Sequence, residues 1–378
     1  MILGRGRNDP PVLSVVVPIH NVAEYLPASL DSILRQPVRD IEVILVDDAS
    51  TDGSRQIAHR YASRVRNVTL HCLEERSGVS IARNVAMPLC RGEFVTFVDS
   101  DDELPADAWS TMLATLRQTG SDFVVGKAER VGPGRRFVTP LMQRNHEVER
   151  LGISIEDQPL MLADVFVWNK IFRRSFWERA EITFPERTRY QDQVALTQAF
   201  LAAKAFDVLT GIVYEWRFRH DLSSATQRRI EITNLRERRG TKVMTLEMVQ
   251  AHESPELLRC LLAEVLPIDM WEHYRAACAD PDPAEPGVMD EYWDVLRDMQ
   301  QRIWNPTTLP IELTVIPPQQ RLMGVLVDQD RRDDLRELIA FIDGLPDGVQ
   351  HIDVGGRTEA VLPFRDDPRI PAAAYAVV

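Results

Sequence analysis

Short apolar runs alternate with amphipathic stretches in the amino-terminal part of the chain. The apolar runs are nearly continuous, which is typical of strands buried on both faces of a sheet. Between the first two runs, Leu26, Leu30 and Ile33 fall at helical spacing. This order predicts an α/β fold in which helices cover a mostly parallel central sheet. The expected strands are Leu13 to Ile19, Glu42 to Asp47, Val68 to Leu73 and Glu93 to Asp99.

Turn and cap residues indicate where the helices between these strands begin and end. A Ser-Thr-Asp-Gly cluster precedes the second expected helix, which runs from Asp52 to about Val65. The third should begin near Gly78 and end around Pro88, because proline cannot continue a helix interior. Later in the chain, a further helix is expected from Gln191 to Lys204.

Polar residues follow three of the expected strands, and ligands of open α/β sheets bind outside the carboxyl ends of the strands. We therefore expect these side chains to gather at one edge of the sheet. They are His20 and Asn21 after the first strand, Asp47 and Asp48 at the end of the second, and Asp99, Ser100, Asp101 and Asp102 at the end of the fourth.

The pattern becomes looser after residue 130, and it suggests three segments. We predict a first domain over residues 1–227, a helical region over 228–305 and a small α+β unit over 306–378. In the last unit, one helix is expected from Gln319 to about Gly344, followed by short strands. The apolar end from Ala372 to Val378 predicts a buried strand, and we expect this unit to be truncated.

Composition narrows the range of partners. The 378 residues carry a formal net charge of -13, so a surface that repels phosphate polymers argues against a nucleic acid partner. The four cysteines lack metal-ligand spacing and form no dense disulfide framework, which favours a reducing cytoplasm. No signal peptide is recognisable, and no apolar run approaches the roughly 18 residues of a membrane span. Any membrane association should therefore be peripheral, at the inner face.

The most informative string is an apolar strand that runs directly into carboxylates, Phe94 to Asp102. Like charges this close are unfavourable unless a cation or hydrogen-bond donors compensate them. A hard divalent ion, Mg²⁺ or Mn²⁺, suits oxygen ligands and shares its coordination shell with substrate phosphates. The alternative is that Asp101 or Asp102 caps a helix that starts near Pro105.

Four motifs of the chain resemble those of the family-2 glycosyltransferases, which have the GT-A fold of nucleotide-diphospho-sugar transferases. They stand in the family's order and spacing. The close resemblance covers residues 12–128, and a looser one continues to about 227. The motifs are Val17 to Asn21, Val46 to Asp52, Ala82 to Asn84 and Val98 to Asp102.

The resemblance implies a role for each matching position on the donor side. Pro18, His20 and Asn21 would lie along the nucleotide, although His20 stands where many relatives have tyrosine and could be a solvated loop histidine instead. Asp47 would accept a hydrogen bond from the base. The remaining implied donor contacts are Arg83 and Asn84 beside the sugar or its diphosphate, and Asp99 with Ser100 near the ribose or the metal's water shell.

The resemblance also implies the catalytic groups. Asp101, with Asp99, would hold Mn²⁺ or Mg²⁺, which stabilises the departing nucleoside diphosphate. Asp192 in the string Tyr190 to Gln193 matches the family's base, although Gln191 replaces the usual glutamate before it. A base that takes the acceptor proton during direct displacement would invert the anomeric centre. The alternative for Asp192 is an aspartate that stabilises a helix N-terminus.

The outer parts of the same domain supply further candidates. In relatives, a loop at the position of Arg219, His220 and Ser223 reaches the diphosphate, so these residues are expected donor or acceptor contacts; an ordinary solvated loop is the alternative. Trp168 is expected either beneath the sugar or in the core.

The chain lacks the motifs that define two other classes of nucleotide-binding enzyme. A dinucleotide-binding oxidoreductase requires a glycine-rich turn after the first strand, but Pro18 to Ala23 contains no glycine. A phosphate-loop kinase fails for the same reason. Two alternatives stay open: a sugar nucleotidyltransferase, which usually opens with a glycine-rich basic loop, and a catalytically silent carbohydrate- or partner-binding module on the same fold.

The expected donor is a UDP-sugar, a preference that comes from the family alone. The middle region resembles transferases of bacterial wall and capsule polymers, which implies a glycan or polyol-phosphate polymer as the acceptor. We expect the carboxyl-terminal region to position that polymer or to mediate homo-oligomerisation.

Overall fold

The computed structural model describes residues 10–132, 134–218, 231–279 and 287–377. They form two compact units, Met1–Ser223 and Ser224–Val378. The division lies near the expected end of the first domain at residue 227. It does not separate residues 228–305 from 306–378, so those two segments stay a prediction.

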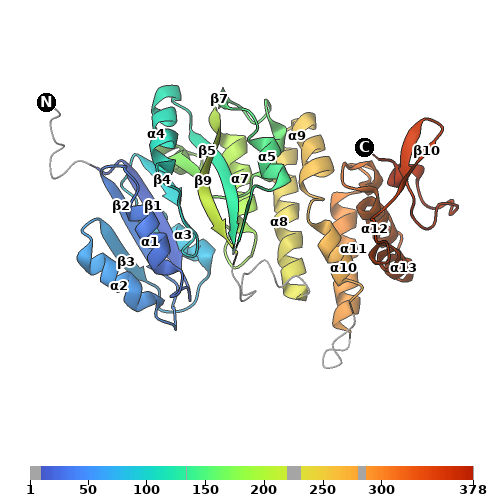
Figure 1. The fold of residues 1–378 in the computed structure, drawn as a ribbon, viewed down its shortest axis with the longest axis horizontal. Helices are drawn as coiled ribbons and strands as arrows, with labels where there is room; N and C mark the ends of the chain where they lie inside the picture. Colours follow the sequence, from blue (N-terminus) through green and yellow to red (C-terminus); the bar gives the residue numbers. More distant parts are fainter. Residues whose placement is uncertain (1–9, 133, 219–230, 280–286, 378) are drawn as a thin grey trace. The chain divides into compact units, whose positions relative to one another are not determined.

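A single mixed sheet forms the centre of the first unit (Figure 1). The strand order is β3-β2-β1-β4-β8-β5-β9-β7, and β6 pairs with β5. The first four strands are parallel to one another, whereas β8 is antiparallel to both β4 and β5. The strands are β1 (Leu13–Ile19), β2 (Ile41–Asp47), β3 (Val68–Cys72), β4 (Phe94–Phe97), β5 (Phe123–Gly132), β6 (Arg135–Phe137), β7 (Arg150–Ile153), β8 (Lys170–Arg173) and β9 (Phe206–Arg217).

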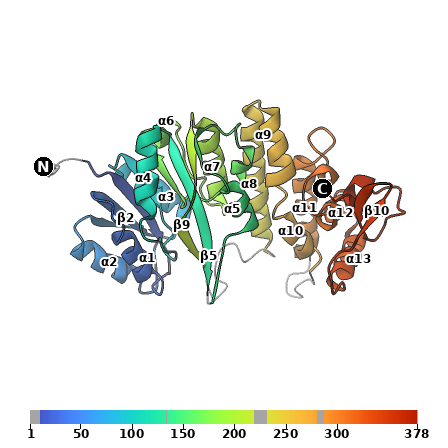
Figure 2. The ribbon, with the colours of Figure 1, turned by 45° about the horizontal axis from the view of Figure 1, so that its top comes forward.

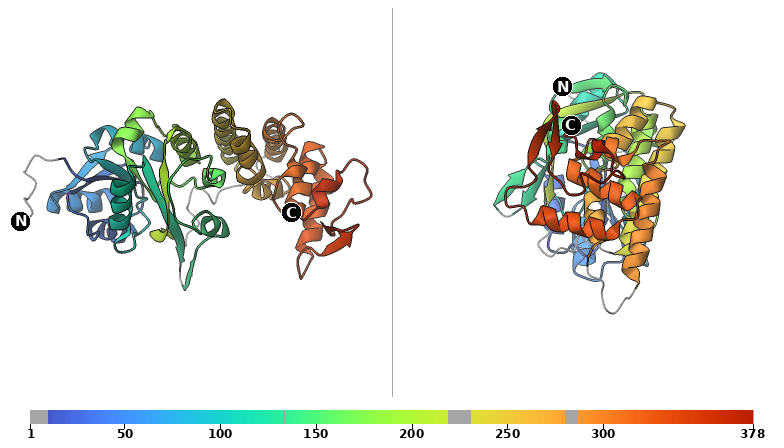
Figure 3. Two further views of the ribbon diagram at one scale, coloured as in Figure 1. Left: turned by 90° about the horizontal axis from the view of Figure 1, so that it is seen from above. Right: turned by 90° about the vertical axis from the view of Figure 1, so that its right-hand side faces the viewer.

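Helices pack on both faces of this sheet, as the views in Figures 2 and 3 show. One core joins α1, α2 and α4 to the residues of β1 that point to the same face, such as Val15 and Val17. The other face carries an aromatic core around Phe97, Phe123 and Phe172. The helices are α1 (Leu26–Leu34), α2 (Ser54–Arg64), α3 (Val79–Ala86), α4 (Ala108–Thr119), α5 (Pro140–Asn145), α6 (Arg174–Arg179) and α7 (Gln191–Ala202), with short 3₁₀ turns η1 (Met87–Leu89) and η2 (Pro159–Ala163).

A local irregularity interrupts the pairing of β5 with β9. The register shifts between Val125 and Ala128, and Gly126 lies within the shift. A Cβ atom at Gly126 would lie 2.4 Å from a Cγ atom of Val213, so only glycine fits there. Beyond the shift, Arg130 lies opposite Trp216 in regular register. The irregularity therefore sets which side chains of the two strands meet at the carboxyl edge of the sheet.

The second unit is helical and ends in a two-stranded sheet (Figure 1). Within it, α12 packs against α10, α11 and α13. The elements are α8 (Ile232–Ala251), α9 (Pro255–Cys260), η3 (Leu261–Val265), α10 (Met270–Ala276), α11 (Val288–Ile303), η4 (Ile311–Leu313), α12 (Pro318–Asp328), α13 (Arg332–Asp343), β10 (His351–Val354), β11 (Arg357–Ala360) and η5 (Ala372–Tyr375).

Two expectations for this unit are wrong. The single helix expected over residues 319–344 is divided into α12 and α13, because Asp330 adopts a left-handed conformation with φ 59° that no α-helix accommodates. The apolar end forms the 3₁₀ turn η5 instead of a strand. The predicted burial holds only in part, since Ala374 and Tyr375 are buried whereas Ala372 and Val377 are exposed.

Candidate active site

The acid turn, residues 99–103, follows β4 at the carboxyl edge of the sheet. Helix α4 begins only at Ala108, with Asp107 at its N-cap position. The alternative in which Asp101 or Asp102 caps this helix is therefore wrong, because the helix starts several residues further along the chain. Local helix capping does not account for the acid turn.

The acid turn is docked onto β9 by hydrogen bonds. The Asp102 carboxylate accepts from the Tyr214 hydroxyl at 2.9 Å and from the backbone N–H of Arg217 at 2.7 Å. The same tyrosine oxygen accepts the backbone N–H of Asp99 at 3.1 Å. A backbone bridge between Glu103 and Glu215 completes the attachment. Asp102 thus holds the turn in place, and Asp99 and Asp101 are presented from it.

Arg83 of α3 joins the acid turn to the candidate base. Arg83 is 1% exposed, and its guanidinium donates to Asp99 at 2.8 Å and to Asp192 of α7. Two carboxylates from segments far apart in the chain are therefore held by one buried cation. Burial opposes the charge on Arg83, but Asp192 and Asp99 outweigh it and raise its pKa. Asp192 lies in the first turn of α7, and its side chain is 19% exposed.

Burial disfavours the ionised carboxylates of Asp99 and Asp102 in the folded protein. Burial, opposed by Arg83 and reinforced by Asp101 and Asp192, raises the pKa of Asp99 to about 6. Burial and the charges of Asp101 and Asp99 also raise the pKa of Asp102 well above its ordinary value. A cation near these oxygens would relieve the repulsion.

The donor set of the acid turn fits a hard divalent ion bound together with a ligand. Within the described ranges, no group of three or more His, Cys, Asp or Glu side chains is placed to enclose a metal. Mg²⁺ and Mn²⁺ sites commonly combine one or two protein carboxylates with substrate phosphates. Asp99 and Asp101 as ligands of such an ion stay a prediction. Ser100, within the turn, is buried.

On the nucleotide side, Asp47 and Asp48 end β2 and are both buried. One Asp47 oxygen accepts from Arg55 Nε at 2.7 Å, and the other has no hydrogen-bond partner among the described residues. Both oxygens of Asp48 accept backbone N–H groups at the start of α3, from Ser77 at 2.6 Å and Gly78 at 2.8 Å. Asp48 thus positions the helix that carries Arg83.

The segment after β1 is tied to the segment after β2. His20 Nδ1 lies 2.6 Å from the carbonyl oxygen of Asp48. The Asn21 side-chain oxygen accepts the backbone N–H of Thr51 at 2.8 Å, and Asn21 itself has a positive φ of 50°. Pro18 is buried within β1, opposite Val46. The three predicted residues are therefore brought to the same edge as Asp47, and their contacts with a nucleotide stay predictions.

Two other predicted residues make internal contacts. Asn84 both donates to and accepts from the backbone of Phe184, at 2.8 and 3.0 Å, so it fixes α3 to the segment that leads to α7. Trp168 is 4% exposed and stacks on Tyr214 and Phe166, with ring centroids 4.2 and 4.7 Å away. Trp168 is therefore a core side chain that supports Tyr214 beneath the acid turn.

Arg219, His220 and Ser223 lie outside the described residues. The sequence reasoning gave no role to Tyr214 or to Asp48, which hold the acid turn and α3. The alternation of Tyr214 with Trp216 on a strand near the carboxyl edge is the signal that could have pointed to the tyrosine.

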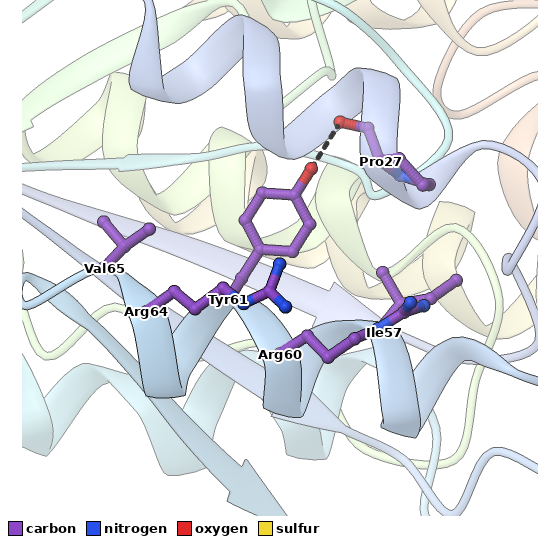
Figure 4. A pocket seen from close by; sticks show the side chains of 6 residues that line it. All are labelled: Pro27, Ile57, Arg60, Tyr61, Arg64 and Val65. Atoms are coloured by element: carbon purple, nitrogen blue, oxygen red, sulfur yellow. Dashed lines mark hydrogen bonds between the residues drawn. The ribbon is translucent and has the colours of Figure 1, made fainter.

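A surface pocket elsewhere in the first unit does not belong to this site. It lies between α1 and α2 and is lined by Pro27, Ile57, Arg60, Tyr61, Arg64 and Val65 (Figure 4). The Tyr61 hydroxyl donates to the Pro27 carbonyl oxygen at 3.3 Å and to Asp31 at 2.7 Å. None of its lining residues belongs to the acid turn or to α7.

The fold is of the GT-A type. Residues 14–179 match the profile of glycosyl transferase family 2. Among curated proteins, the uncharacterized glycosyltransferase EpsJ of Bacillus subtilis is 31% identical over 216 residues, which are 55% of this chain and 61% of EpsJ. TarS of Staphylococcus aureus, a poly(ribitol-phosphate) beta-N-acetylglucosaminyltransferase, is 29% identical over 270 residues, which are 69% of this chain and 42% of TarS.

Solved structures agree on the fold. Residues 1–349 of S. aureus TarS in complex with UDP superpose with a TM-score of 0.70 at 22% identity, covering 94% of this chain and 97% of that structure. The mannosyltransferase PcManGT of Pyrobaculum calidifontis, in complex with GDP-Man and Mn²⁺, has a TM-score of 0.51 at 18% identity, covering 86% of this chain and 88% of that one. The GT-A prediction is therefore confirmed. The chain spans less than two thirds of the length of EpsJ.

None of the described helices is both long enough and apolar enough to cross a bilayer.

Proposed function

We propose that the chain is an inverting, metal-dependent glycosyltransferase that moves a sugar from a nucleotide-diphosphate donor to a hydroxyl of a polymer acceptor. The observation that carries this proposal is the bridge formed by Arg83 between Asp99 and Asp192. It joins the acid turn to the candidate base at one edge of the sheet. The family match of residues 14–179 supports the same activity.

Each described residue has a distinct task in this mechanism. The buried, unpartnered oxygen of Asp47 is the acceptor for an N–H of the base. Asp101 and Asp99 would hold Mn²⁺ or Mg²⁺, which, when bound, stabilises the negative charge of the departing diphosphate. The raised pKa of Asp99 is consistent with a carboxylate that needs such a partner.

Asp192 takes the proton of the acceptor hydroxyl as the new glycosidic bond forms. Its ion pair with Arg83 fixes one carboxylate oxygen and so orients the base. A single base on one side of the sugar implies direct displacement and inversion at the anomeric carbon. Asp99 shares Arg83 with Asp192, so the base is oriented by the same cation that contacts the donor side.

The substrates are proposed from the relatives. TarS has been solved with UDP and with UDP-GlcNAc, and its name gives poly(ribitol phosphate) as its acceptor. By analogy, a UDP-sugar and a glycan or polyol-phosphate polymer of the cell envelope are the proposed substrates here. A cytoplasmic location at the inner face of the membrane, and homo-oligomerisation through the carboxyl-terminal region, stay predictions.

The charge arrangement favours an enzyme over a silent binding module. A module that only binds sugar has no need of a partly exposed carboxylate held by a buried arginine beside an acid turn. A sugar nucleotidyltransferase usually has a glycine-rich basic loop after the first strand, and this chain lacks that loop. The family match of residues 14–179 also favours sugar transfer.

Replacing Asp192 by asparagine tests the proposal. Asp192→Asn should lower kcat by about 10²- to 10⁴-fold, the usual contribution of a general base, because the amide cannot take the acceptor proton. Binding of UDP in the presence of Mn²⁺, measured by calorimetry, should stay within about twofold of the unchanged protein. Turnover is measured as UDP release from a panel of UDP-sugars, with TarS-type polyol-phosphate oligomers as acceptors.

Asp107→Asn is the matched control. Asp107 is an exposed aspartate near the acid turn with a positive φ of 59°, which asparagine tolerates well. It should leave turnover unchanged. Near-normal turnover of Asp192→Asn would remove Asp192 from this role, and metal-independent binding of UDP would remove the acid turn from its role.

A further inference from the structure

Arg130, near the end of β5, has no charged partner of its own. Its guanidinium carbon lies 3.3 Å from the ring centroid of Trp216 and 4.4 Å from that of Phe218. No hydrogen bond or ion pair is made by Arg130 within the part of the chain that the structure describes. Burial lowers its pKa to about 10, although Asp102 opposes this effect. A partly buried cation thus lies against two aromatic rings.

Among the described residues of the acid turn and of the β5–β9 pair, four carboxylates have partners other than Arg130. Glu129 and Glu215 both pair with Arg136. Asp102 is hydrogen-bonded to Tyr214 and Arg217, and Glu103 pairs with Arg217. An arginine stacked on an aromatic ring still presents the N–H groups of its planar edge, and these match a phosphate or carboxylate in a bidentate geometry. The neighbourhood therefore leaves one guanidinium edge for an anion from outside.

The register of the sheet places Arg130 beside the acid turn. Trp216 stands between Glu215 and Arg217, the two residues to which the acid turn is docked. Arg130 is opposite Trp216 in the β5–β9 pair. Phe166 also contacts Trp216, with ring centroids 5.0 Å apart. A cation and half-buried aromatic rings thus form one platform next to the candidate site.

The strand order indicates which substrate reaches this platform. The nucleotide-side residues follow β1 and β2, and the acid turn follows β4. Arg130 and Trp216 lie on β5 and β9, on the opposite side of the acid turn from β1 and β2. A donor whose diphosphate lies at the acid turn has its nucleotide on the other side. The ligand that meets Arg130 is therefore the acceptor.

We propose that Arg130, stacked on Trp216, binds an anionic group of the polymer acceptor, a phosphodiester or a uronate, next to the hydroxyl that receives the sugar. This inference rests on the proposed function and specifies its acceptor. Half-buried aromatic faces suit the carbon skeleton of a sugar or polyol, and the guanidinium edge suits the charge that such polymers carry.

The test uses the full chain saturated with UDP and Mn²⁺. Calorimetry measures its binding of a ribitol-phosphate oligomer, of a galacturonate oligomer and of an uncharged cello-oligosaccharide. Arg130→Gln should weaken binding of the anionic oligomer by about 10- to 100-fold, the loss expected for a charge-assisted bidentate contact, and should leave the affinity for UDP unchanged. Arg130→Lys keeps the charge without the planar fork. Its affinity for the anionic oligomer should lie between those of the unchanged protein and of Arg130→Gln. The two anionic probes distinguish phosphate from carboxylate.

Arg135→Gln is the matched control on the same hairpin. Arg135 is exposed and also lies over an aromatic ring, that of Phe137, at 4.4 Å. It should bind the oligomers like the unchanged protein. The proposal is overturned if the unchanged protein binds UDP but neither anionic oligomer. It is also overturned if Arg130→Gln lowers only the melting temperature and keeps oligomer affinity. Binding through Arg130 without any sugar transfer would instead contradict the proposed function and leave this site standing.

Discussion

Two groups of charged side chains in the first unit shift the pKa values of their carboxylates in opposite directions. The Asp164 cluster consists of His146, Asp164, Asn169 and Lys170, all fully buried. In it, Asp164 accepts from Lys170 at 2.6 Å, from His146 at 2.8 Å and from Asn169 at 3.1 Å. Burial alone would raise the pKa of Asp164, but Lys170 and His146 outweigh it and lower that pKa to about 2.

The acid turn has the reverse balance. Asp99 shares the buried cation Arg83 with Asp192, and Asp101 stands close enough to disfavour the charge on Asp99. The pKa of Asp99 is consequently raised to about 6, and that of Asp102 is raised as well. A charge group that is complete within the protein stabilises the fold, whereas one that lacks positive charge is prepared for a cationic ligand. The balance of charge alone therefore distinguishes the structural Asp164 cluster from the acid turn of the candidate site, without comparison with any relative.

The largest effect is expected at the Asp164 cluster. Asp164→Asn should lower the free energy of unfolding at pH 7 by about 3 to 5 kcal/mol, because the buried ammonium of Lys170 loses the carboxylate with which it is paired. Since the folded pKa of Asp164 is depressed, its contribution is present above the unfolded value of 3.8 and is lost as the pH falls through about 2. Urea unfolding at pH 7 measures the difference.

A surface carboxylate provides the comparison for that variant. Glu178 pairs with Arg174 on α6, and its side chain is 56% exposed. Glu178→Gln should change the free energy of unfolding by less than about 1 kcal/mol, as exposed pairs do. If Asp164→Asn were equally mild, the Asp164 cluster would not be the stabilising group that its hydrogen bonds indicate.

Removal of a charge from the acid turn should change the free energy of unfolding in the opposite direction. Asp99→Asn, without metal at pH 7.5, should raise the free energy of unfolding by about 1 to 2 kcal/mol, because it removes a charge that burial and Asp101 disfavour. The estimate is reduced because the Asp99 side chain is 32% exposed. The folded pKa is raised, so the penalty is fully present above about 6 and disappears as the pH falls towards the unfolded value of 3.8.

Bound metal and nucleotide should make the unchanged protein more stable than Asp99→Asn. With Mn²⁺ and UDP, the unchanged protein should gain stability that Asp99→Asn does not, because the variant has lost a carboxylate of the proposed site. Urea unfolding at pH 7.5 and at pH 5, with and without Mn²⁺ and UDP, makes the comparison. Destabilisation by Asp99→Asn under all four conditions would show that the acid turn is a structural group like the Asp164 cluster.

The strands and helices that pack against the first half of the sheet could be predicted closely from sequence. Continuous apolar runs mark buried parallel strands, and β1 occupies the range that its apolar run indicates, Leu13–Ile19. The break at Asp330 could not be found in this way, because the residues on both sides of it keep a helical pattern. A backbone conformation at one residue leaves little trace in hydrophobic periodicity.

The sequence predicts which residues lie at this edge of the sheet but not the contacts that they make. Sheet topology brings the ends of β1, β2 and β4 together, so acids at those ends had to be neighbours. The pairing of Arg83 with Asp192 joins residues 109 positions apart, and the sequence does not fix how α7 packs beside α3. The role of Tyr214, 112 positions from Asp102, was hidden for the same reason.

The smallest effect is expected where the acid turn is attached to the rest of the sheet. Tyr214→Phe removes the hydroxyl that donates to Asp102 and accepts from the Asp99 backbone, while the ring keeps its place against Trp168. It should lower the free energy of unfolding by about 1 kcal/mol, the usual net value of a hydrogen bond. Because the hydroxyl orders the segment that presents Asp101, binding of UDP with Mn²⁺ should weaken as well, by several-fold. Trp168→Phe, which preserves an aromatic contact and removes no hydrogen bond to the turn, serves as the control. A loss of stability without any loss of nucleotide binding would mean that Tyr214 supports the sheet alone, and that the acid turn keeps its geometry independently of β9.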